Sequence, residues 1–312
     1  MNAHVNLQNR DTLGTLRLFP GQGSQAVGMG RVSVQTSHAA AEFFDAASEA
    51  LAIDLRKLCW QTSLDVLTRT ENAQVALTAC CIADWLAFTH DNDAEPNCAA
   101  DACAGHSNGA VAAAVAAGFL TPVEGMRLAA ARGALMAQAP KGGSMLAVIP
   151  PSVTVTEQEL AGVAQALADE YDVDVGALNS PHQFVLSGDV GRLLRIHDRL
   201  DVNSKMLTVS NAFHSRFMRP VVPRWIETVE SCDFHDGWCK YVGCTTATAT
   251  SNADDVKFDL VEGMTRPVRW LGVMEATKTL PRIEVFGPGQ VIVRLARSHL
   301  GLRKLQLIGG GH

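Results

Sequence analysis

Several features that mark particular classes of protein are missing from this sequence. The apolar runs, such as Ala110–Leu120, fall short of the roughly 18–20 residues that a helix needs to span a bilayer. The 26 basic and 32 acidic residues give a net charge of −6 and form no basic stripe, which argues against nucleic-acid binding. The N-terminal residues contain no apolar signal-peptide core. We therefore expect a soluble, cytoplasmic protein that has neither a membrane nor a nucleic acid as its partner.

Metal-binding cysteine patterns are also missing. The eight cysteines include no C-x-x-C pair, and no group of cysteines and histidines has the spacing of a zinc site. Several lie in apolar surroundings, as Cys80 and Cys81 do between alanine and isoleucine. Such thiols are usually buried and reduced. We expect reduced thiols and no bound metal.

The composition that remains is that of a chain with a large core. Of the 312 residues, 47% are hydrophobic and 19% are charged, which excludes a disordered protein. The length fits one large domain or two unequal ones. The 26 glycines and the abundant alanines let helices lie close to a sheet, which favours a layered α/β fold.

Hydrophobic periodicity and turn residues predict alternating strands and helices. Strands are expected at 15–19, 144–149, 174–178, 183–187, 205–210, 241–244 and 283–286. Helices are expected at 38–51, 72–88, 110–118, 122–138, 154–168, 191–200, 219–232 and 269–279. Thr121, Pro122 and Glu124 give the helix at 122–138 a capping box with proline at its first position.

The order of elements changes between residues 142 and 210. There the prediction is β-α-β-β-α-β, the split βαβ pattern of a ferredoxin-like α+β domain. We expect a large domain made of residues 1–141 and 211–312, with a small ferredoxin-like domain inserted at 142–210. The large domain is expected to be α/β hydrolase-like, with three layers.

Ser107 is the strongest candidate for a nucleophile. It stands in Gly105-His106-Ser107-Asn108-Gly109, which fits the G-x-S-x-G pattern of a strand-turn-helix elbow. The glycines make room for a sharp turn, and a strand before and a helix after are both predicted. At the helix N-terminus, the dipole and the N–H of Asn108 can stabilise an oxyanion. These features favour a nucleophile over a structural turn.

A serine of this kind needs a base, and His214 is the best candidate among ten histidines. It directly follows the proposed insert, where two domains would meet and form a cleft. His106 adjoins the serine but should point away from it. The others are placed less suitably: His4, His299 and His312 near the termini, His90 and His235 in polar or irregular segments, and His182 and His197 within the insert.

Arg132 stands alone among alanines in the predicted helix at 122–138. Burying an unpaired arginine is costly. It could face solvent or form an ion pair, or it could act as a bidentate clamp on a substrate carboxylate. A clamp would hold an acyl group that ends in a carboxylate and would stay unpaired with a plain acyl group.

Seven motifs occur together in an order that characterises one enzyme family. They are 18–25 (LFPGQGSQ), 105–109 (GHSNG), Arg132 followed by glycine, 179–181 (NSP), 212–214 (AFH), 266–270 (RPVRW) and 287–289 (GPG). Through these motifs, over about residues 15–298, the chain resembles the malonyl-CoA:acyl-carrier-protein transacylases. The resemblance implies malonyl transfer from malonyl-CoA to the phosphopantetheine-type thiol of an acyl carrier protein, with no cofactor and no metal.

The resemblance also implies a role for each matching residue. Ser107 would be acylated, and His214 would be its base and later its acid. Main-chain N–H groups of Gln22 and Asn108 would form the oxyanion hole, and Arg132 would pair with the malonyl carboxylate.

Four further positions take roles from the same resemblance. Met136, Asn179 and Phe213 would line the substrate pocket, where the Phe213 ring would crowd an α-methyl branch. A main-chain carbonyl near Gly263, rather than an acidic side chain, would orient the histidine.

The chain departs from the family pattern in one position that bears on its pathway. Members of fatty-acid synthesis usually continue the elbow with glutamate, whereas here Ala110 follows. An alanine is similar to what the transacylase subunit of malonate decarboxylase has, so this subtype is favoured. A transacylase of fatty-acid or polyketide synthesis is the alternative.

Two other functions are compatible with parts of the sequence. An α/β-hydrolase esterase or thioesterase would use the same elbow but needs an acid between serine and histidine. Asp189 and Asp201 are available, yet both fall in the insert, and the early glycine-rich turn and Arg132 stay unexplained. A non-catalytic subunit that docks a carrier protein would not need Ser107 and His214.

Overall fold

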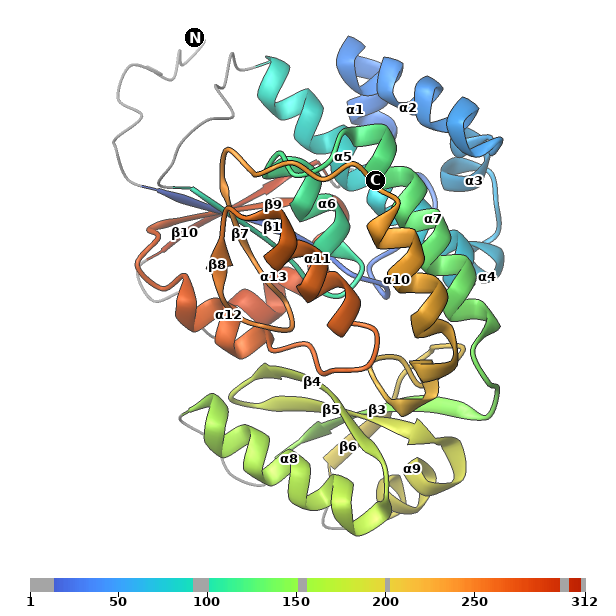
Figure 1. Cartoon of the computed structure of the whole chain (residues 1–312), viewed down its shortest axis with the longest axis vertical. Coiled ribbons are helices and arrows are strands. Elements are labelled where there is room, and N and C mark those ends of the chain that lie inside the picture. Colours follow the sequence, from blue (N-terminus) through green and yellow to red (C-terminus); the bar gives the residue numbers. More distant parts are fainter. Residues whose placement is uncertain (1–13, 92–100, 151–155, 200–202, 298–302, 310–312) are drawn as a thin grey trace, which may run out of the picture.

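The computed structural model describes residues 14–91, 101–150, 156–199, 203–297 and 303–309. Within these ranges the fold is mixed α/β, with two separate sheets (Figure 1). Several positions considered above lie outside the described residues: His4, Cys98, Asp201, His299 and His312.

The larger sheet carries the two segments that meet at the site. Its six strands have the order β10-β9-β1-β2-β7-β8. They are β1 (Thr15–Phe19), β2 (Ala102–Gly105), β7 (Lys240–Val242), β8 (Ala249–Thr250), β9 (Arg282–Phe286) and β10 (Lys304–Ile308). All neighbouring pairs are parallel except β7 with β8. The register of β1 with β2 places Phe19 opposite Gly105, so both strands end at the same edge.

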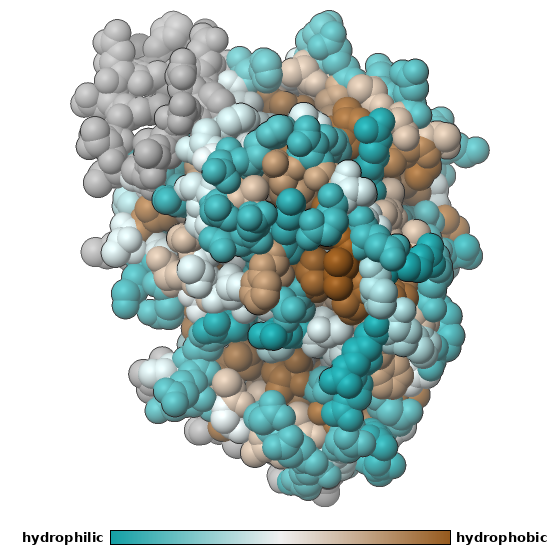
Figure 2. All heavy atoms as spheres, in the orientation of Figure 1, coloured by the Kyte–Doolittle hydropathy of each residue, from teal (hydrophilic) through white to brown (hydrophobic). Residues whose placement is uncertain are grey.

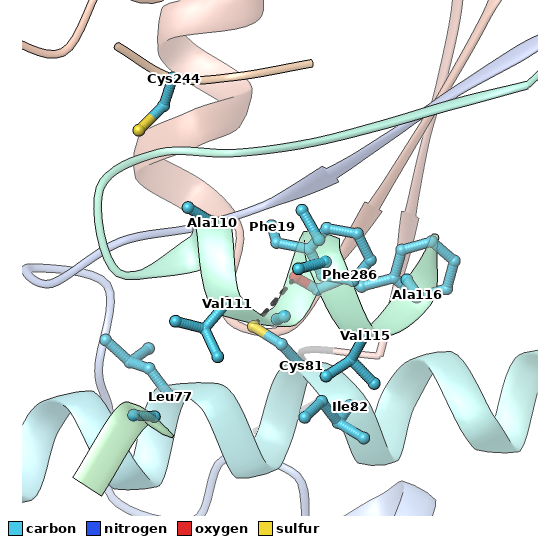
Figure 3. Close-up of a cluster of buried hydrophobic side chains, with 14 of the residues drawn as sticks. Phe19, Leu77, Cys81, Ile82, Ala110, Val111, Val115, Ala116, Cys244 and Phe286 are labelled. Atoms are coloured by element: carbon cyan, nitrogen blue, oxygen red, sulfur yellow. Dashed lines mark hydrogen bonds between the residues drawn. The ribbon is translucent and has the colours of Figure 1, made fainter. Parts of the chain in front are cut away.

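Small residues let helices lie close together on this sheet. Every residue of α6 (Gly109–Ala116) is buried, which explains its composition of alanine, valine and glycine. At Gly125 in α7 (Pro122–Gln138), an added Cβ would lie 2.3 Å from Cγ2 of Val115, so the two helices exclude a larger side chain there. Figure 3 shows Val111 and Val115 of α6 facing α5 (Thr70–Asp91), with Val115 next to Ile82. Close helix packing thus accounts for much of the alanine and glycine content.

The second sheet is antiparallel and has its own core. Its order is β4-β5-β3-β6, from β3 (Gly143–Ile149), β4 (Asp174–Ser180), β5 (Gln183–Asp189) and β6 (Asn203–Met206). The helices α8 (Glu157–Tyr171) and α9 (Val190–His197) cover the face that lies away from the larger sheet (Figure 1). The order β3-α8-β4-β5-α9-β6 is the predicted β-α-β-β-α-β order. Backbone hydrogen bonds join this unit to the larger body, from Leu178 N to Val268 O (2.8 Å) and from Val268 N to Gly176 O (3.0 Å).

The remaining elements surround the large sheet. They are α1 (Arg31–Thr36), α2 (His38–Leu51), α3 (Leu55–Trp60), α4 (Leu64–Leu67), η1 (Arg216–Val221), α10 (Val222–Glu230), α11 (Ala253–Glu262), α12 (Trp270–Ala276) and α13 (Gln290–Arg297). Figure 2 shows a mostly hydrophilic face with an apolar group over α10 and α11, the helices that carry the exposed Ile226 and Phe258. None of the helices in the described ranges is long and apolar enough to cross a membrane.

Several predicted elements have different bounds in the structure, and three of them have a clear cause. The helix expected at 154–168 is α8 at 157–171, because Thr156 and Glu159 form a capping box at its start. The strand expected at 205–210 is β6, which ends at Met206. The helix expected at 219–232 is divided into η1 and α10, with Pro220 inside the first and Pro223 in the first turn of the second.

Candidate active site

Ser107 occupies a strained turn between β2 and α6. Its φ is 52°, in the left-handed region that only glycine adopts without cost. His106 N donates to Phe19 O (3.0 Å), and Gly109 N donates back to His106 O (3.0 Å). These bonds hold the turn against the end of β1. The serine in this turn is half-buried.

The glycines on either side of Ser107 are required by space. A Cβ added at Gly105 would lie 1.9 Å from the carbonyl carbon of Gly109, and one added at Gly109 would lie 2.1 Å from Phe19 O. A Cβ at Gly21 would lie 2.4 Å from His106 O, so the turn after β1 also touches the elbow. The glycine-rich turn and the elbow therefore form one packed unit.

His214 is within hydrogen-bonding distance of the serine. Its Nε2 lies 2.6 Å from Ser107 Oγ, and its ring is 4% exposed. Its φ of 56° is a second strained backbone position. Hydrogen bonds hold the loop in place, from Ser187 Oγ to Phe213 O (2.5 Å) and from Asn211 Nδ2 to Ala139 O (3.2 Å). Because Ser187 lies on β5, the antiparallel unit helps to position the histidine.

The surroundings of His214 keep its ring neutral. Its pKa is lowered to about 3, first by burial and then by the nearby Arg132 and His106, whereas the backbone of Gly263 and Arg266 acts in the opposite direction. A neutral imidazole can accept the proton of the Ser107 hydroxyl. Ser107 and His214 thus have the geometry and charge state of a nucleophile and its base.

We expect the ring of His214 to stay neutral throughout the range in which an unperturbed histidine titrates, near pH 6.5. Nitrogen NMR of the ring should show no protonation of the His214 signal between pH 5 and 8, and His214→Ala identifies that signal. The urea-unfolded chain is the control and should titrate normally. Because the unfolded ring binds a proton below about pH 6.5 and the folded ring does not, stability should fall as the pH drops below that value. A folded-state signal that titrates near pH 6.5 would contradict the assignment.

Arg132 is buried beside the serine with no acidic partner among the described residues. Its side chain is 4% exposed. Its Nη1 donates to Gln74 Oε1 (2.8 Å), and its Nη2 lies 3.5 Å from Ser107 Oγ. Burial lowers its pKa to about 10, so the guanidinium is still charged at neutral pH. Of the alternatives that the sequence leaves open, the solvent-facing arginine is wrong, and no ion pair to Arg132 occurs among the described residues.

Gln74 orients this arginine, and the sequence analysis did not select it. The residue lies on α5, is 1% exposed, and donates from Nε2 to Met136 Sδ (3.2 Å). Its main-chain oxygen accepts from Asn108 Nδ2 (3.2 Å). Gln74 thus joins the arginine, the elbow and Met136. A polar residue inside the apolar helix predicted at 72–88 was the signal that could have found it.

The two expected oxyanion donors lie in adjacent turns. Asn108 follows the serine directly, and Gln22 follows Gly21, which packs on the elbow. In the part of the chain that the structure describes, neither main-chain N–H donates a hydrogen bond. The Gln22 side chain points toward the start of α5, where its Nε2 donates to Thr70 Oγ1 (3.4 Å).

The other expected site residues have distinct surroundings. Asn179 Oδ1 lies 2.9 Å from Nε2 of His106, whose ring points away from the serine toward the antiparallel unit, as expected. Phe213 precedes His214 in sequence and is 5% exposed. Gly263 caps the C-terminal end of α11. Arg132 thus lies beside Ser107, whereas Met136 contacts Gln74 and Asn179 contacts His106.

Comparison with known proteins agrees with this site. The acyl transferase domain family matches residues 17–256. The chain is 33% identical over 288 residues to the malonyl CoA-acyl carrier protein transacylase of Synechocystis sp., covering 91% of this chain and 92% of that protein. The chain belongs to the malonyl-CoA:acyl-carrier-protein transacylase family.

Other transacylases of the family match over most of their length. A polyketide-biosynthesis malonyl CoA-acyl carrier protein transacylase from Bacillus velezensis is 32% identical over 290 residues, which are 89% of this chain and 94% of that protein. The crystal structure of the acyl-carrier-protein-S-malonyltransferase from Bartonella henselae superposes with a TM-score of 0.86 at 27% identity, over 95% of this chain and 96% of that one. The mixed α/β fold is therefore the fold of the transacylases.

Proposed function

We propose that this transacylase moves a malonyl group from malonyl-CoA, through an acyl-Ser107 intermediate, to the phosphopantetheine-type thiol of an acyl carrier protein. The observation that carries the proposal is Arg132, a buried cation without a carboxylate partner among the described residues, 3.5 Å from the Ser107 hydroxyl. A buried charge needs a counter-charge. The free carboxylate of a malonyl group would supply one at the point where its thioester reaches the serine.

The first half-reaction acylates the enzyme. His214 Nε2 takes the proton of Ser107 Oγ as that oxygen attacks the thioester carbonyl. The main-chain N–H groups of Gln22 and Asn108 hold the negative oxygen of the tetrahedral intermediate. When the carbon–sulfur bond breaks, His214 gives the proton to the departing CoA sulfur.

The second half-reaction reverses these steps with another thiol. The carrier thiol loses its proton to His214 and attacks the acyl-serine ester. As the intermediate collapses, the Ser107–acyl bond breaks and His214 returns the proton to Oγ. The same Arg132 holds the malonyl carboxylate throughout, so the acyl group keeps its orientation between the two thiols.

Main-chain carbonyls take the place of a third acidic residue in this proposal. The backbone of Gly263 and Arg266 raises the pKa of the His214 ring against the larger effect of burial. These groups would stabilise the imidazolium that forms during each half-reaction, with Gly263 in the orienting role.

The acyl pocket is proposed to lie between Met136 and Phe213. Met136 is one turn after Arg132 on α7 and is 1% exposed, and Phe213 adjoins the base. The Phe213 ring would disfavour acyl groups with an α-methyl branch. Asn179 would act on the pocket indirectly, because its side-chain oxygen is hydrogen-bonded to His106.

We place this activity in fatty-acid or polyketide synthesis. The two transacylases reported above support this alternative over the malonate decarboxylase subunit that Ala110 favoured. Ala110 is 2% exposed and belongs to the buried cluster with Phe19 and Val111 in Figure 3. Its small size therefore satisfies packing and does not report on the carrier protein.

The domain description is part of the proposal. We infer that residues 142–210 form a ferredoxin-like domain inserted into an α/β hydrolase-like domain of residues 1–141 and 211–312. The antiparallel strand order β4-β5-β3-β6, and a core separate from that of the large sheet, support it.

Intact-protein mass spectrometry tests the function. Malonyl-CoA should add one malonyl group, which peptide mapping should place on Ser107, and a holo carrier protein should then remove it. Carriers of fatty-acid synthesis, polyketide synthesis and malonate decarboxylase should be compared, and we expect one of the first two to be preferred. Hydrolysis without transfer would support a thioesterase, and no adduct with any acyl-CoA would support a docking subunit.

A further inference from the structure

Asp259 is a buried carboxylate near the site that has no role in the reaction described above. It lies on α11 and is 1% exposed. Four donors bind it: Tyr241 Oη (2.8 Å) and Cys244 N (3.0 Å) at Oδ2, and Thr245 N (2.9 Å) and Thr246 N (2.9 Å) at Oδ1. All four partners donate, so the group is bound as a carboxylate.

These bonds fix the turn that follows β7. Strand β7 ends at Val242, two residues before the end expected from the sequence, because Gly243 N donates to Thr248 O (3.1 Å) and Cys244 N then donates to the carboxylate rather than to a neighbouring strand. A Cβ at Gly243 would lie 2.4 Å from Asp259 Oδ1, so the turn needs glycine there. Arg269 N donates to Cys244 O (2.7 Å) from the other side. Hydrogen bonds thus hold the turn through its main-chain N–H groups and through the carbonyl of Cys244.

The same turn lies near the nucleophile and the arginine, because both act on the pKa of Cys244. Cys244 is 3% exposed, and Figure 3 places it beside Ala110 at the start of α6. Its thiol pKa is raised to about 12, first by burial and then by Asp259, while Arg132 and the backbone of Ser107 act in the opposite direction. Burial also raises the pKa of Tyr241, so Tyr241 and Cys244 are both neutral groups near Arg132 at pH 7.

Asp259 is also linked to the groups beside the base. A Cβ at Gly263, the C-cap of its helix, would lie 3.1 Å from Thr245 Oγ1 in the turn. The end of α11, where the Gly263 backbone raises the pKa of His214, therefore packs on the turn that Asp259 holds.

We propose that Asp259 is a positioning residue for acyl transfer, which holds the Cys244–Thr246 turn against Ser107 and Arg132 and the end of α11 against His214. The inference rests on the proposed function where it concerns the substrate. The structural measurements that test it do not depend on that function. Misplacing catalytic groups by about 1 Å can cost up to ~100-fold in rate. In Asp259→Asn, the amide nitrogen would face N–H donors and leave some of them without an acceptor.

The first test needs no substrate. Iodoacetamide labelling with peptide mapping should show that Cys244 is alkylated at least about tenfold faster in Asp259→Asn than in the wild type. The alkylation rate of Cys59, a buried thiol of α3, should stay the same. Asp254→Asn makes the same chemical change on an exposed carboxylate of α11 and should change neither rate. If both thiols react faster together, the protein has loosened as a whole and the proposal is overturned.

The second test uses the reaction. Per active site titrated with malonyl-CoA, Asp259→Asn should lose about 10–100-fold in kcat/KM and part of its preference for malonyl over acetyl. Tyr241→Phe removes one of the four bonds and should give a smaller loss, about fivefold, in the same direction. If Asp259→Asn does not fold, Tyr241→Phe tests the proposal instead. A labelling rate and an acyl selectivity equal to those of the wild type in Tyr241→Phe would overturn the proposal. A wild-type protein that forms no malonyl adduct would refute the proposed function alone, since the labelling result stands without it.

Discussion

Ser107→Ala is expected to form no acyl adduct with malonyl-CoA and to transfer malonyl groups at least about 10⁴-fold more slowly than the wild type. The loss is large because both half-reactions pass through the Ser107 ester, and no other described hydroxyl lies 2.6 Å from His214 Nε2. Alanine and serine adopt the φ of 52° with similar strain, so the elbow should keep its shape. Intact mass and transfer to a holo carrier protein measure the effect.

The control for this variant is a serine elsewhere. Ser231→Ala changes an exposed serine at the C-terminal end of α10 and should leave both the adduct and the transfer rate unchanged. Thermal unfolding should show that Ser107→Ala is as stable as the wild type. An adduct of normal yield on Ser107→Ala would refute the assignment of the nucleophile.

Local sequence signals predicted the elements whose ends depend on neighbouring residues. The helix expected at 122–138 has those bounds as α7, because Thr121 and Glu124 form a capping box that needs no tertiary contact. The start of α11 carried a similar signal, with Asn252 as the cap and two aspartates in the first turn, yet no helix was predicted there. That omission was a missed signal, not a limit of the sequence.

Tertiary contacts decide the elements whose ends the sequence misplaced. The strand expected at 241–244 ends at Val242 because Asp259, 15 residues later than Cys244, takes the N–H of Cys244 that a strand would use. Nothing near 241–244 in the sequence indicates that competition. Long-range partners of this kind are the part of a fold that propensity and periodicity omit.

The residues of the site also fall into two groups, those that a local motif identifies and those that depend on distant contacts. The elbow, His214 and Arg132 could be found because their motifs encode close backbone approaches and specific chemistry. Gln74 carried only the weak signal of a polar residue inside an apolar helix, and Asp259 belongs to no motif, because each acts through contacts with segments distant in sequence. The neutral state of His214 also depends on burial and on the neighbouring Arg132 and His106, none of which its own motif shows.

The second large effect is expected at Arg132. Arg132→Ala should lower kcat/KM for malonyl-CoA by about 10²–10³-fold, since a buried carboxylate that loses its partner costs roughly 3–4 kcal/mol. Acetyl-CoA has no such carboxylate, so its rate should change little and the preference for malonyl should largely disappear. Rates of adduct formation with the two acyl-CoAs, compared in the same variant, give this preference directly.

Two matched variants make the result specific. Arg127→Ala removes an exposed arginine from the same helix and should keep the wild-type preference. Arg132→Lys keeps a positive charge but lacks the planar fork, so an intermediate preference is expected. Because Gln74 orients the guanidinium, Gln74→Ala should shift the preference in the same direction as Arg132→Lys. An unchanged malonyl-to-acetyl ratio in Arg132→Ala would show that the buried cation serves the fold and not the substrate.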